Sequence, residues 1–396
     1  MGHQVTSPLP DGVLADALSA LLNNGSSVYE MGPAATAMEI NLVRWMGGLL
    51  GFPPTCGGAL TSGGSLGNFT ALLAARQARA GFDCWKLGQQ AGPPLAVLCS
   101  DQTHYCVQRA VRMMGWGDDG AVSIPTDSRY KMRADLLKSA LAQSRHVGRR
   151  VIGVVASASS TSTGAIDPLE EIAEFCGRHD LWFHVDGAHG ASLAISEKHR
   201  CRLKGIERAD SVVWDPHKLM LMPALITGII YRDANHAYGA FAQEASYLFG
   251  GADPRDEWFN TGIRTLECTK LIMGFKLYSS LRIHGEGMFA SYVEAMLERA
   301  TQFAALLRQA GDFRVAVEPE CNIVCFRYEP RGHQMSDAKQ AEIRERVIRR
   351  GGFYLVKTRL RDGVYLRTTL LNPLVTLEDL KALLEEIRTV GATLGR

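Results

Sequence analysis

A lysine follows one of the short apolar runs of this chain. The stretch ADSVVWDPHKLM, residues 209–220, places Lys218 just beyond the β-branched and aromatic run SVVW. A lysine at the mouth of a buried strand either extends its charged end to solvent or offers an amine for Schiff-base chemistry. The residue alone does not decide between these two interpretations, so the neighbouring motifs matter.

A carboxylate follows a second apolar run. Asp186 ends LWFHVD, and the small residues Gly187 and Ala188 after it suit the close approach of a flat ring. In a parallel sheet, side chains just beyond the carboxyl ends of the strands line the ligand crevice. The other interpretation is an aspartate that only caps the turn after the strand.

A glycine-rich turn precedes a strongly helical run in TSGGSLGNFTALLAAR, which contains Gly64 and Ser65. Free backbone N–H groups and the helix dipole favour a phosphate at such a helix start. The turn lacks the Gly-Lys-Ser/Thr of a Walker A loop and the G-x-G-x-x-G spacing of dinucleotide sites. Alone, it equally fits a purely structural turn.

The three features together match the needs of pyridoxal phosphate (PLP). This cofactor requires an anion site, a partner for its pyridinium nitrogen and a lysine that forms a Schiff base. Asp186 would keep the ring nitrogen protonated, and Lys218 would hold the aldehyde until an amino acid displaces it. We also expect burial beside cationic groups to lower the pKa of Lys218, which would favour imine exchange.

The composition predicts a soluble cytoplasmic enzyme. Of 396 residues, 46% are hydrophobic, and 43 basic residues nearly balance 41 acidic ones, so neither nucleic acid nor a membrane surface is indicated as a partner. No apolar run approaches the roughly 20 residues of a membrane span, and the start, expected to be frayed, lacks a secretory-signal layout. Nine cysteines without zinc spacing predict reduced thiols and no metal site.

The pattern of elements predicts three parts. Residues 1–56 contain two helical patterns and form an N-terminal arm. From 57 to 285, short apolar runs alternate with helix-like stretches, which predicts a large α/β domain with a mostly parallel sheet covered by helices. Residues 286–396 show two-residue alternation followed by a helix, and we expect a small α+β domain.

Local signals mark individual turns and helix starts. Asp167 is the expected N-cap of a helix that begins at Pro168. Asp362-Gly363 is the expected hairpin turn of the last two strands. Thr376 and Asp379 have capping-box spacing at the start of the final helix.

Six motifs, in order along the chain, give the sequence a specific resemblance to a known family. TSGGSLGNFTALLAAR, SDQTHYCVQRA, TSTGAIDPLEEIAEFC, FHVDGAHGAS, SVVWDPHKLM and YLRTTLLNP resemble those of the group II PLP-dependent decarboxylases. That family includes the glutamate, cysteine sulfinate, aromatic amino acid and 2,4-diaminobutyrate decarboxylases, and the similarity runs from about Tyr29 to the C-terminus. It implies fold type I with a seven-stranded sheet in the large domain, PLP as cofactor, and a homodimer with the active site at the subunit interface.

The resemblance also implies roles for individual residues. His104 would stack on the ring, Tyr247 would lie on a catalytic loop and help to protonate Cα, and Arg367 would hold a substrate carboxylate. The further implied contacts are Thr161 and Ala188 to the cofactor, Gly64, Ser65, Ser211 and His217 to its phosphate, and Tyr29 to the substrate. Two positions depart from the family: Asp215 stands where many members have asparagine, and Lys270 replaces a common arginine.

We therefore expect an amino acid decarboxylase that acts on a small acidic or polar substrate such as glutamate, aspartate, cysteine sulfinate or diaminobutyrate. His189, where the acidic-substrate branch often has an aromatic residue, argues against that preference. The alternatives are an aromatic, tyrosine-type decarboxylase, a PLP-dependent carbon-carbon lyase or other fold-type-I enzyme, and a PLP-binding partner protein without activity.

Overall fold

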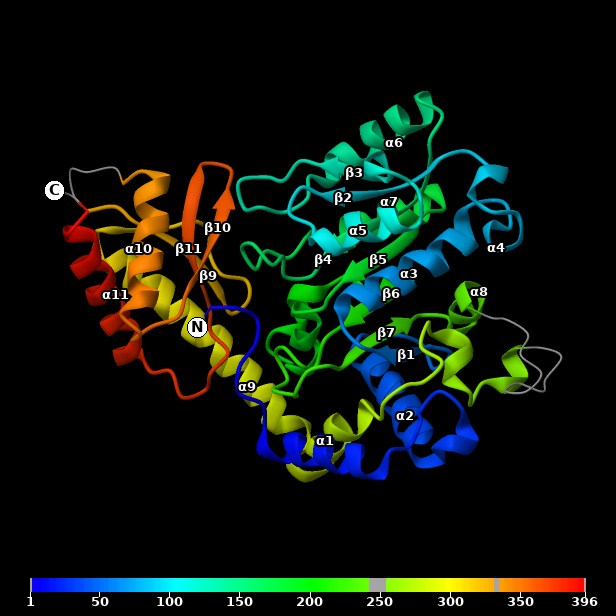
Figure 1. Ribbon diagram of the computed structural model, residues 1–396. Coiled ribbons are helices and arrows are strands. Elements are labelled where there is room, and N and C mark those ends of the chain that lie inside the picture. Colours follow the sequence, from blue (N-terminus) through cyan, green and yellow to red (C-terminus); the bar gives the residue numbers. More distant parts are fainter. Residues whose placement is uncertain (1, 242–253, 331–334, 395–396) are drawn as a thin grey trace.

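The computed structural model describes residues 2–241, 254–330 and 335–394. Its larger sheet has seven strands in the order β1-β7-β6-β5-β4-β2-β3 (Figure 1). The strands are β1 Gly57–Thr61, β2 Leu95–Ser100, β3 Ala121–Ile124, β4 Arg150–Ser157, β5 Trp182–Asp186, β6 Ser211–Trp214 and β7 Thr227–Tyr231. The five strands from β6 to β3 are parallel to their neighbours, whereas β7 is antiparallel to both β1 and β6. The predicted mostly parallel, seven-stranded sheet is confirmed.

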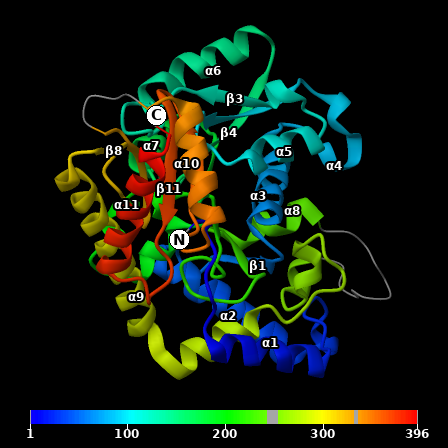
Figure 2. The same cartoon turned by 60° about the vertical axis from the view of Figure 1, so that its left-hand side comes forward.

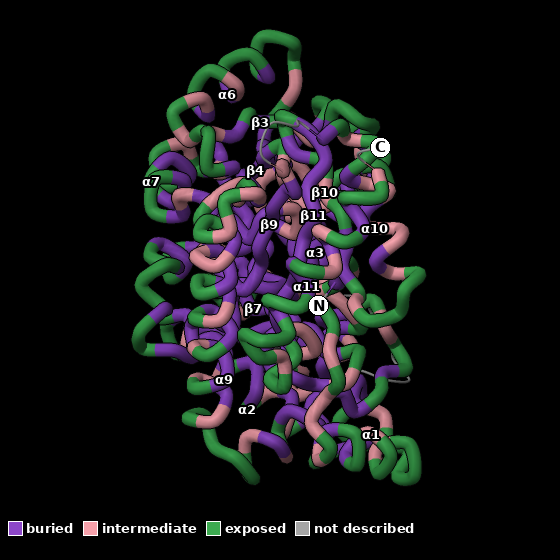
Figure 3. Tube along the Cα trace, turned by 90° about the vertical axis from the view of Figure 1, so that its left-hand side faces the viewer, coloured by how far each residue is buried: buried purple, intermediate pink, exposed green. Residues whose placement is uncertain are grey.

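Two layers of helices cover this sheet because alternate residues of each strand face opposite sides. Val97, Val155 and Val213 pack with helices α3, α5 and α8, while Leu98, Val154 and Val212 pack with α2, α6, α7 and part of α9. The helices of the two layers are α2 Pro33–Leu49, α3 Gly64–Arg79, α5 Tyr105–Met113, α6 Leu137–His146, α7 Leu169–His179, α8 Tyr238–Phe241 and α9 Gly274–Ala310. Figure 3 shows the buried strands at the centre and the exposed turns around them.

A second, four-stranded sheet has the order β10-β11-β9-β8. It contains β8 Phe313–Val315, β9 Ile323–Tyr328, β10 Val356–Leu360 and β11 Gly363–Thr369, with α10 Asp337–Arg349 and α11 Leu377–Ala392. These helices and the end of α9 cover one face, and the other face packs on Tyr130 and Ala165 of the larger sheet's loops (Figure 2). Helix α9 is broken at Gly285 (φ 71°, ψ 167°). The predicted large domain ends at this residue, and the boundary between the two domains remains a proposal.

The structure corrects two local predictions. Helix α7 begins at Leu169 after Pro168, and Asp167 is not its cap, since the buried Asp167 carboxylate accepts hydrogen bonds from the backbone N–H groups of Met132 and Ser157. Burial raises the pKa of Asp167 to about 6. The hairpin loop lies one residue earlier than predicted, because Gly363 already pairs with Leu360.

Other local predictions hold. The capping box of Thr376 and Asp379 is present. The described residues contain no helix with the length and apolar character needed to cross a membrane. Sequence patterns missed β1 and β3: β1 reads as a glycine-rich turn, and β3 is a half-exposed edge strand.

The N-terminal arm is fixed by a buried ion pair. Helices α1 (Pro10–Leu22) and α2 of this arm pack along α9. The short helix α4 (Cys84–Leu87) is not part of the arm. Lys270 Nζ forms an ion pair with Glu39 of α2, and both side chains are almost fully buried. Glu39 also accepts a hydrogen bond from the backbone of Leu60 at 2.9 Å. Lys270, the departure from the family's arginine, thus joins the arm to the segment before α9.

Replacing one partner of this pair should destabilise the fold strongly. Lys270→Met leaves Glu39 as an uncompensated buried charge, which costs about 3–5 kcal/mol. The double variant Glu39→Leu/Lys270→Met should recover most of that loss in urea unfolding. Lys381→Met removes an exposed pair with Glu378 and should cost less than about 1 kcal/mol. Equal losses of unfolding free energy in Lys270→Met and Lys381→Met would show that the buried pair of Lys270 and Glu39 does not fix the arm.

Candidate active site

A cavity of about 310 Å³ opens at the carboxyl ends of β4, β5 and β6, beside the start of α3. The parallel register places Ser157, Asp186 and Val213 side by side, so the residues after these strands meet at one edge. The predicted site residues that line the cavity are Gly64, Ser65, His104, Thr161, Asp186, Ala188, His217 and Lys218.

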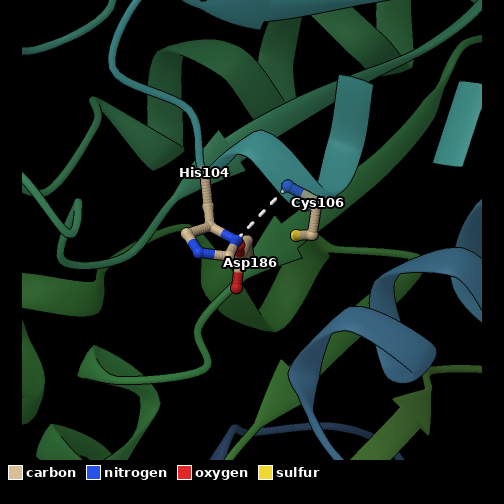
Figure 4. A group of neighbouring side chains, drawn as sticks. All are labelled: His104, Cys106 and Asp186. Carbon is tan, nitrogen blue, oxygen red and sulfur yellow. Dashed lines mark hydrogen bonds between the residues drawn. The ribbon is translucent and has the colours of Figure 1, made fainter. Parts of the chain in front are cut away.

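Asp186 and His104 both line the cavity, and their side chains lie close together (Figure 4). Asp186 is 8% exposed and accepts a hydrogen bond from the backbone of Ala188 at 3.2 Å. His104 caps α5, with its Nδ1 accepting from the backbone N–H of Cys106 at 3.4 Å. Burial lowers the pKa of His104, so its ring is neutral and suited to stacking on another flat ring.

Cys106 completes a group of three potential ligands with His104 and Asp186. Their ligand atoms lie within 4.8 Å of one another. Burial raises the pKa of the Cys106 thiol, whereas a metal ion would need the thiolate. The thiol is therefore uncharged in the described site, beside the carboxylate of Asp186.

The start of α3 presents backbone N–H groups to the cavity. Its N-cap, Gly63, has φ 126°, a conformation that favours glycine, and no side chain caps the helix. A Cβ at Gly64 would lie only 2.9 Å from Asp215 Oδ2. The turn is thus open to an anion and too tight for a larger residue, and we call residues 63–65 the phosphate cradle.

A buried chain of hydrogen bonds, which sequence reasoning missed, supports the cradle. Asn68 donates to the carbonyl of Gly64 at 2.8 Å, and its Oδ1 lies 2.8 Å from His184 Nε2. His184 Nδ1 lies 2.8 Å from Ser211 Oγ, which accepts a hydrogen bond from Trp182. The sequence contained a signal for this chain of hydrogen bonds. Asn68 lies one helical turn after Gly64, and His184 lies two residues before Asp186 and so on the same face of the strand.

Ser211 therefore has a different place from the predicted one. It begins β6, at the end of the strand far from Lys218, is fully buried and does not line the cavity. We withdraw Ser211 from the phosphate contacts. Burial lowers the pKa of His184 to about 4, so the imidazole stays neutral, and donation from Nε2 to Asn68 leaves Nδ1 to accept from Ser211.

Lys218 contacts a carboxylate that the sequence left unassigned. Its Nζ lies 2.9 Å from Asp215 Oδ2. Burial opposes the charged amine, but the charge of Asp215 and its hydrogen bond, helped by Asp186, outweigh burial and raise the pKa of Lys218. The expected lowering was wrong because the nearest charged neighbours are anions.

His217 faces the same carboxylate, with Nε2 3.6 Å from Asp215 Oδ2. Its Nδ1 lies 2.6 Å from the carbonyl oxygen of Ile226. Burial lowers the pKa of His217, and Asp215 only partly offsets that effect. A neutral His217 with Nδ1–H bonded to Ile226 leaves Nε2 as an acceptor on the cavity side.

Three predicted residues do not line the cavity or cannot be placed. Arg367 is 7% exposed, donates to the carbonyl of Thr161, and has a buried Nε without a partner among the described residues. Tyr29 is 43% exposed and packs on Phe259. Tyr247 lies outside the described residues. Their roles stay predictions.

The N-terminal segment packs on the rest of the chain, contrary to the expected frayed start, and Figure 1 shows it beside the smaller sheet before α1. Gly2 packs closely on Tyr354 near β10, and Leu9 donates to the carbonyl of Leu221. Gln4 lines the cavity, and its Nε2 is buried without a partner among the described residues. Sequence patterns gave no signal for Gln4, because tertiary contacts with Tyr354 and Leu221, far along the chain, bring this segment to the site.

Residues 6–329 match the model of the pyridoxal-dependent decarboxylase conserved domain. The chain belongs to this family. It is thus a PLP-dependent amino acid decarboxylase, as the ordered motifs predicted. The described residues fit the cofactor: the uncapped cradle suits its phosphate, Asp186 its ring nitrogen and Lys218 its aldehyde.

Two relatives and a solved structure support the family and the fold. An aromatic-L-amino-acid decarboxylase of Bacillus atrophaeus is 30% identical over 96% of this chain and 78% of its own. A human cysteine sulfinic acid decarboxylase is 31% identical over 97% of this chain and 80% of its own. Among solved structures, mouse CSAD in apo form superposes with a TM-score of 0.92 at 27% identity, covering 98% of this chain and 83% of the other.

Removing the support of the cradle should weaken cofactor binding. Asn68→Ala removes the hydrogen bond that holds the carbonyl of Gly64 in the cradle, and losing about 1.4 kcal/mol of this positioning would weaken PLP binding roughly tenfold. Fluorescence titration of the PLP-free protein would measure the loss. Asn41→Ala, which removes an exposed asparagine on α2, is the matched control. Unchanged PLP affinity in Asn68→Ala would show that the hydrogen-bond chain does not position the cradle.

Proposed function

We propose that the protein converts a small acidic or polar L-amino acid, of the glutamate, aspartate, cysteine sulfinate or diaminobutyrate kind, into its amine and carbon dioxide. The observation that carries the proposal is the polarity of the cavity. Among the described residues that line it, Ala188 and Leu225 are the only apolar side chains larger than glycine. A hydrophobic substrate side chain would meet few aliphatic side chains there.

Most of the predicted site residues that line the cavity have a proposed task. The cradle and Ser65 bind the phosphate, with His217 beside them, and Asp186 holds a proton on the ring nitrogen. His104 and Ala188 enclose the ring from its two faces. Lys218 holds the cofactor before the substrate arrives, and PLP, when bound, supplies the electron sink for the breaking carboxylate bond.

The substrate side chain would meet polar, uncharged groups. Burial lowers the pKa of His189 to about 3, so this ring is neutral and its Nε2 bonds to Asn322 at 2.6 Å. Gln4 offers an unpaired amide nitrogen, which can donate to an anionic side chain. Arg367 is the proposed cation for a substrate carboxylate, once it exchanges the carbonyl of Thr161 for that ligand.

The two curated relatives leave an aromatic substrate as the second candidate, because their identities to this chain are nearly equal at 30% and 31%. Family membership counts against the carbon-carbon lyase and the inactive partner protein. The nine free thiols, seven of them buried, support the proposed cytoplasmic location.

A substrate panel tests the proposal. The PLP-loaded protein is incubated separately with the protein amino acids, cysteine sulfinate and diaminobutyrate, and carbon dioxide and amine are both measured. We expect one small acidic or polar substrate to exceed tyrosine and tryptophan in kcat/KM by at least about tenfold, equivalent to ~1.4 kcal/mol of transition-state binding. Lys218→Ala is the background control. Preference for an aromatic substrate would refute the assignment.

Gln4 should contribute to substrate preference. Gln4→Ala removes the amide donor and should raise KM for an anionic substrate about tenfold, and Gln4→Glu should raise it further through repulsion. Affinity for PLP should not change. Val5→Ala, at the exposed neighbouring position, should behave as the wild type, and a Gln4→Glu enzyme with normal KM would exclude this contact.

A homodimer with the active site at its interface is the proposed assembly. Helix α1 exposes an apolar stripe, Leu14, Leu18 and Leu21, at helical spacing. Such a stripe on a soluble enzyme fits a partner copy.

Light scattering tests the dimer. The wild type should have twice the chain mass of 43.2 kDa, and Leu14→Glu/Leu21→Glu should shift it to the monomer with loss of activity. Leu87→Glu, on the exposed α4, should stay dimeric. A wild-type monomer with full activity would refute the proposed assembly.

A further inference from the structure

His189 begins a path of hydrogen bonds that leads from the cavity to the four-stranded sheet. It is 2% exposed and lines the cavity directly after Ala188. Its Nε2 lies 2.6 Å from Asn322 Oδ1, and its Nδ1 is buried without a partner among the described residues. Burial lowers the pKa of this ring to about 3, so the ring is neutral and carries one proton.

Asn322 decides which nitrogen of His189 carries that proton. Asn322 is fully buried, and its Nδ2 donates to the carbonyl of Leu370 at 2.9 Å, which leaves Oδ1 as the atom that faces His189. Nε2 must therefore be the donor of the 2.6 Å contact. The thiol of Cys321, a weaker donor, also lies 3.2 Å from Oδ1. His189 thus supplies the strong hydrogen bond of this buried oxygen.

Asn322 belongs to a corner of the four-stranded sheet that also carries Arg367. Asn322 directly precedes β9, and the backbone N–H of Leu370, directly after β11, donates to its carbonyl at 2.8 Å. Near this junction, Arg367 of β11 pairs with Cys325 of β9. We call Asn322, Leu370 and the strand ends that they join the β9–β11 corner. A displacement of this corner would displace Arg367.

His189 is itself fixed to the loop after β4. The backbone N–H of Gly190 donates to the carbonyl of Ala158 at 3.1 Å, and a Cβ on Gly190 would lie only 2.5 Å from that oxygen. The same loop continues to Thr161, which lines the cavity. His189 and Thr161 therefore belong to one part of the cavity wall.

Two hydrogen bonds join the β9–β11 corner to this part of the wall. His189 donates to Asn322, and Arg367 donates to the carbonyl of Thr161. A substrate carboxylate that binds Arg367 would take its guanidinium from Thr161. The bond from His189 does not depend on that exchange and would keep the corner in place.

We propose that His189 is a positioning residue for decarboxylation, whose Nε2–H holds the β9–β11 corner at the cavity while Arg367 exchanges Thr161 for the substrate carboxylate. The inference rests on the proposed substrate role of Arg367. No proton leaves His189, so another neutral donor at this point serves equally well. A phenylalanine, which has a ring but no donor, does not.

Two substitutions separate the donor from the ring. His189→Gln keeps an N–H at about the reach of Nε2, whereas His189→Phe keeps a ring and removes the N–H. Glutamate, cysteine sulfinate, diaminobutyrate and tyrosine are supplied separately to the PLP-loaded proteins. For each amino acid that the wild type decarboxylates, His189→Phe should raise KM about tenfold with kcat within about twofold, because it weakens uniform binding of the carboxylate. His189→Gln should restore KM to within about threefold of the wild type.

Hydrogen exchange gives a readout that needs no substrate. The peptide that contains Leu370 should exchange roughly tenfold faster in His189→Phe than in the wild type, because the corner opens more often. In His189→Gln it should exchange at the wild-type rate. Lys131→Met is the matched control, since it removes the ion pair with Glu320, outside the cavity lining and just before the corner, and should leave KM unchanged.

The outcomes distinguish this inference from the proposed function. A raised KM in Arg367→Gln with a normal KM in His189→Phe refutes the inference alone. An equal rise of KM in His189→Gln and His189→Phe, or in Lys131→Met and His189→Phe, also refutes it. Faster exchange without a change in KM would leave His189 with a structural role only. A normal KM in Arg367→Gln would instead refute the proposed substrate role of Arg367.

Discussion

The parallel register of β4, β5 and β6 is the constraint on which the site depends. Because Ser157, Asp186 and Val213 are neighbours in the sheet, the turns that follow them converge on one cavity. The turn after β6 is short and is held to Ala188 by the backbone of Asp215. A shift by one residue would turn Asp186 to the opposite face of the sheet, which would separate the proposed ring-nitrogen partner from Lys218.

The charge of each group at the cavity depends on its burial and on its nearest charged neighbour. The histidines lose their charge because burial lowers their pKa values, while Lys218 keeps its charge because Asp215 touches it. Among the described residues, the cavity therefore holds two carboxylates, Asp186 and Asp215, beside the ammonium of Lys218.

The sequence predicted the elements that have strong periodicity and the residues at strand ends. The apolar runs became β2, β4, β5, β6 and β7, and the carboxylate, lysine and glycine turn meet in one cavity. The misplaced and missed residues depend on tertiary contacts. Ser211 lies at the start of β6, whereas the cavity lies at the other end of that strand. Asp167 accepts a hydrogen bond from the backbone of Met132 instead of capping its own helix. Gln4 reaches the cavity because Tyr354 near β10 and Leu221 after β6 hold the N-terminal segment.

The pKa of Lys218 was predicted with the wrong sign because charge contacts cannot be read from spacing alone. Asp215 lies three residues before Lys218, but only the turn between them brings the two groups to 2.9 Å. The central claim, a covalent site at Lys218, is tested most directly by borohydride reduction of the PLP-loaded protein and peptide mapping by mass spectrometry. The account predicts one pyridoxyl adduct, on the peptide that contains Lys218. An adduct on another lysine, or none on a protein that retains bound PLP, would contradict it.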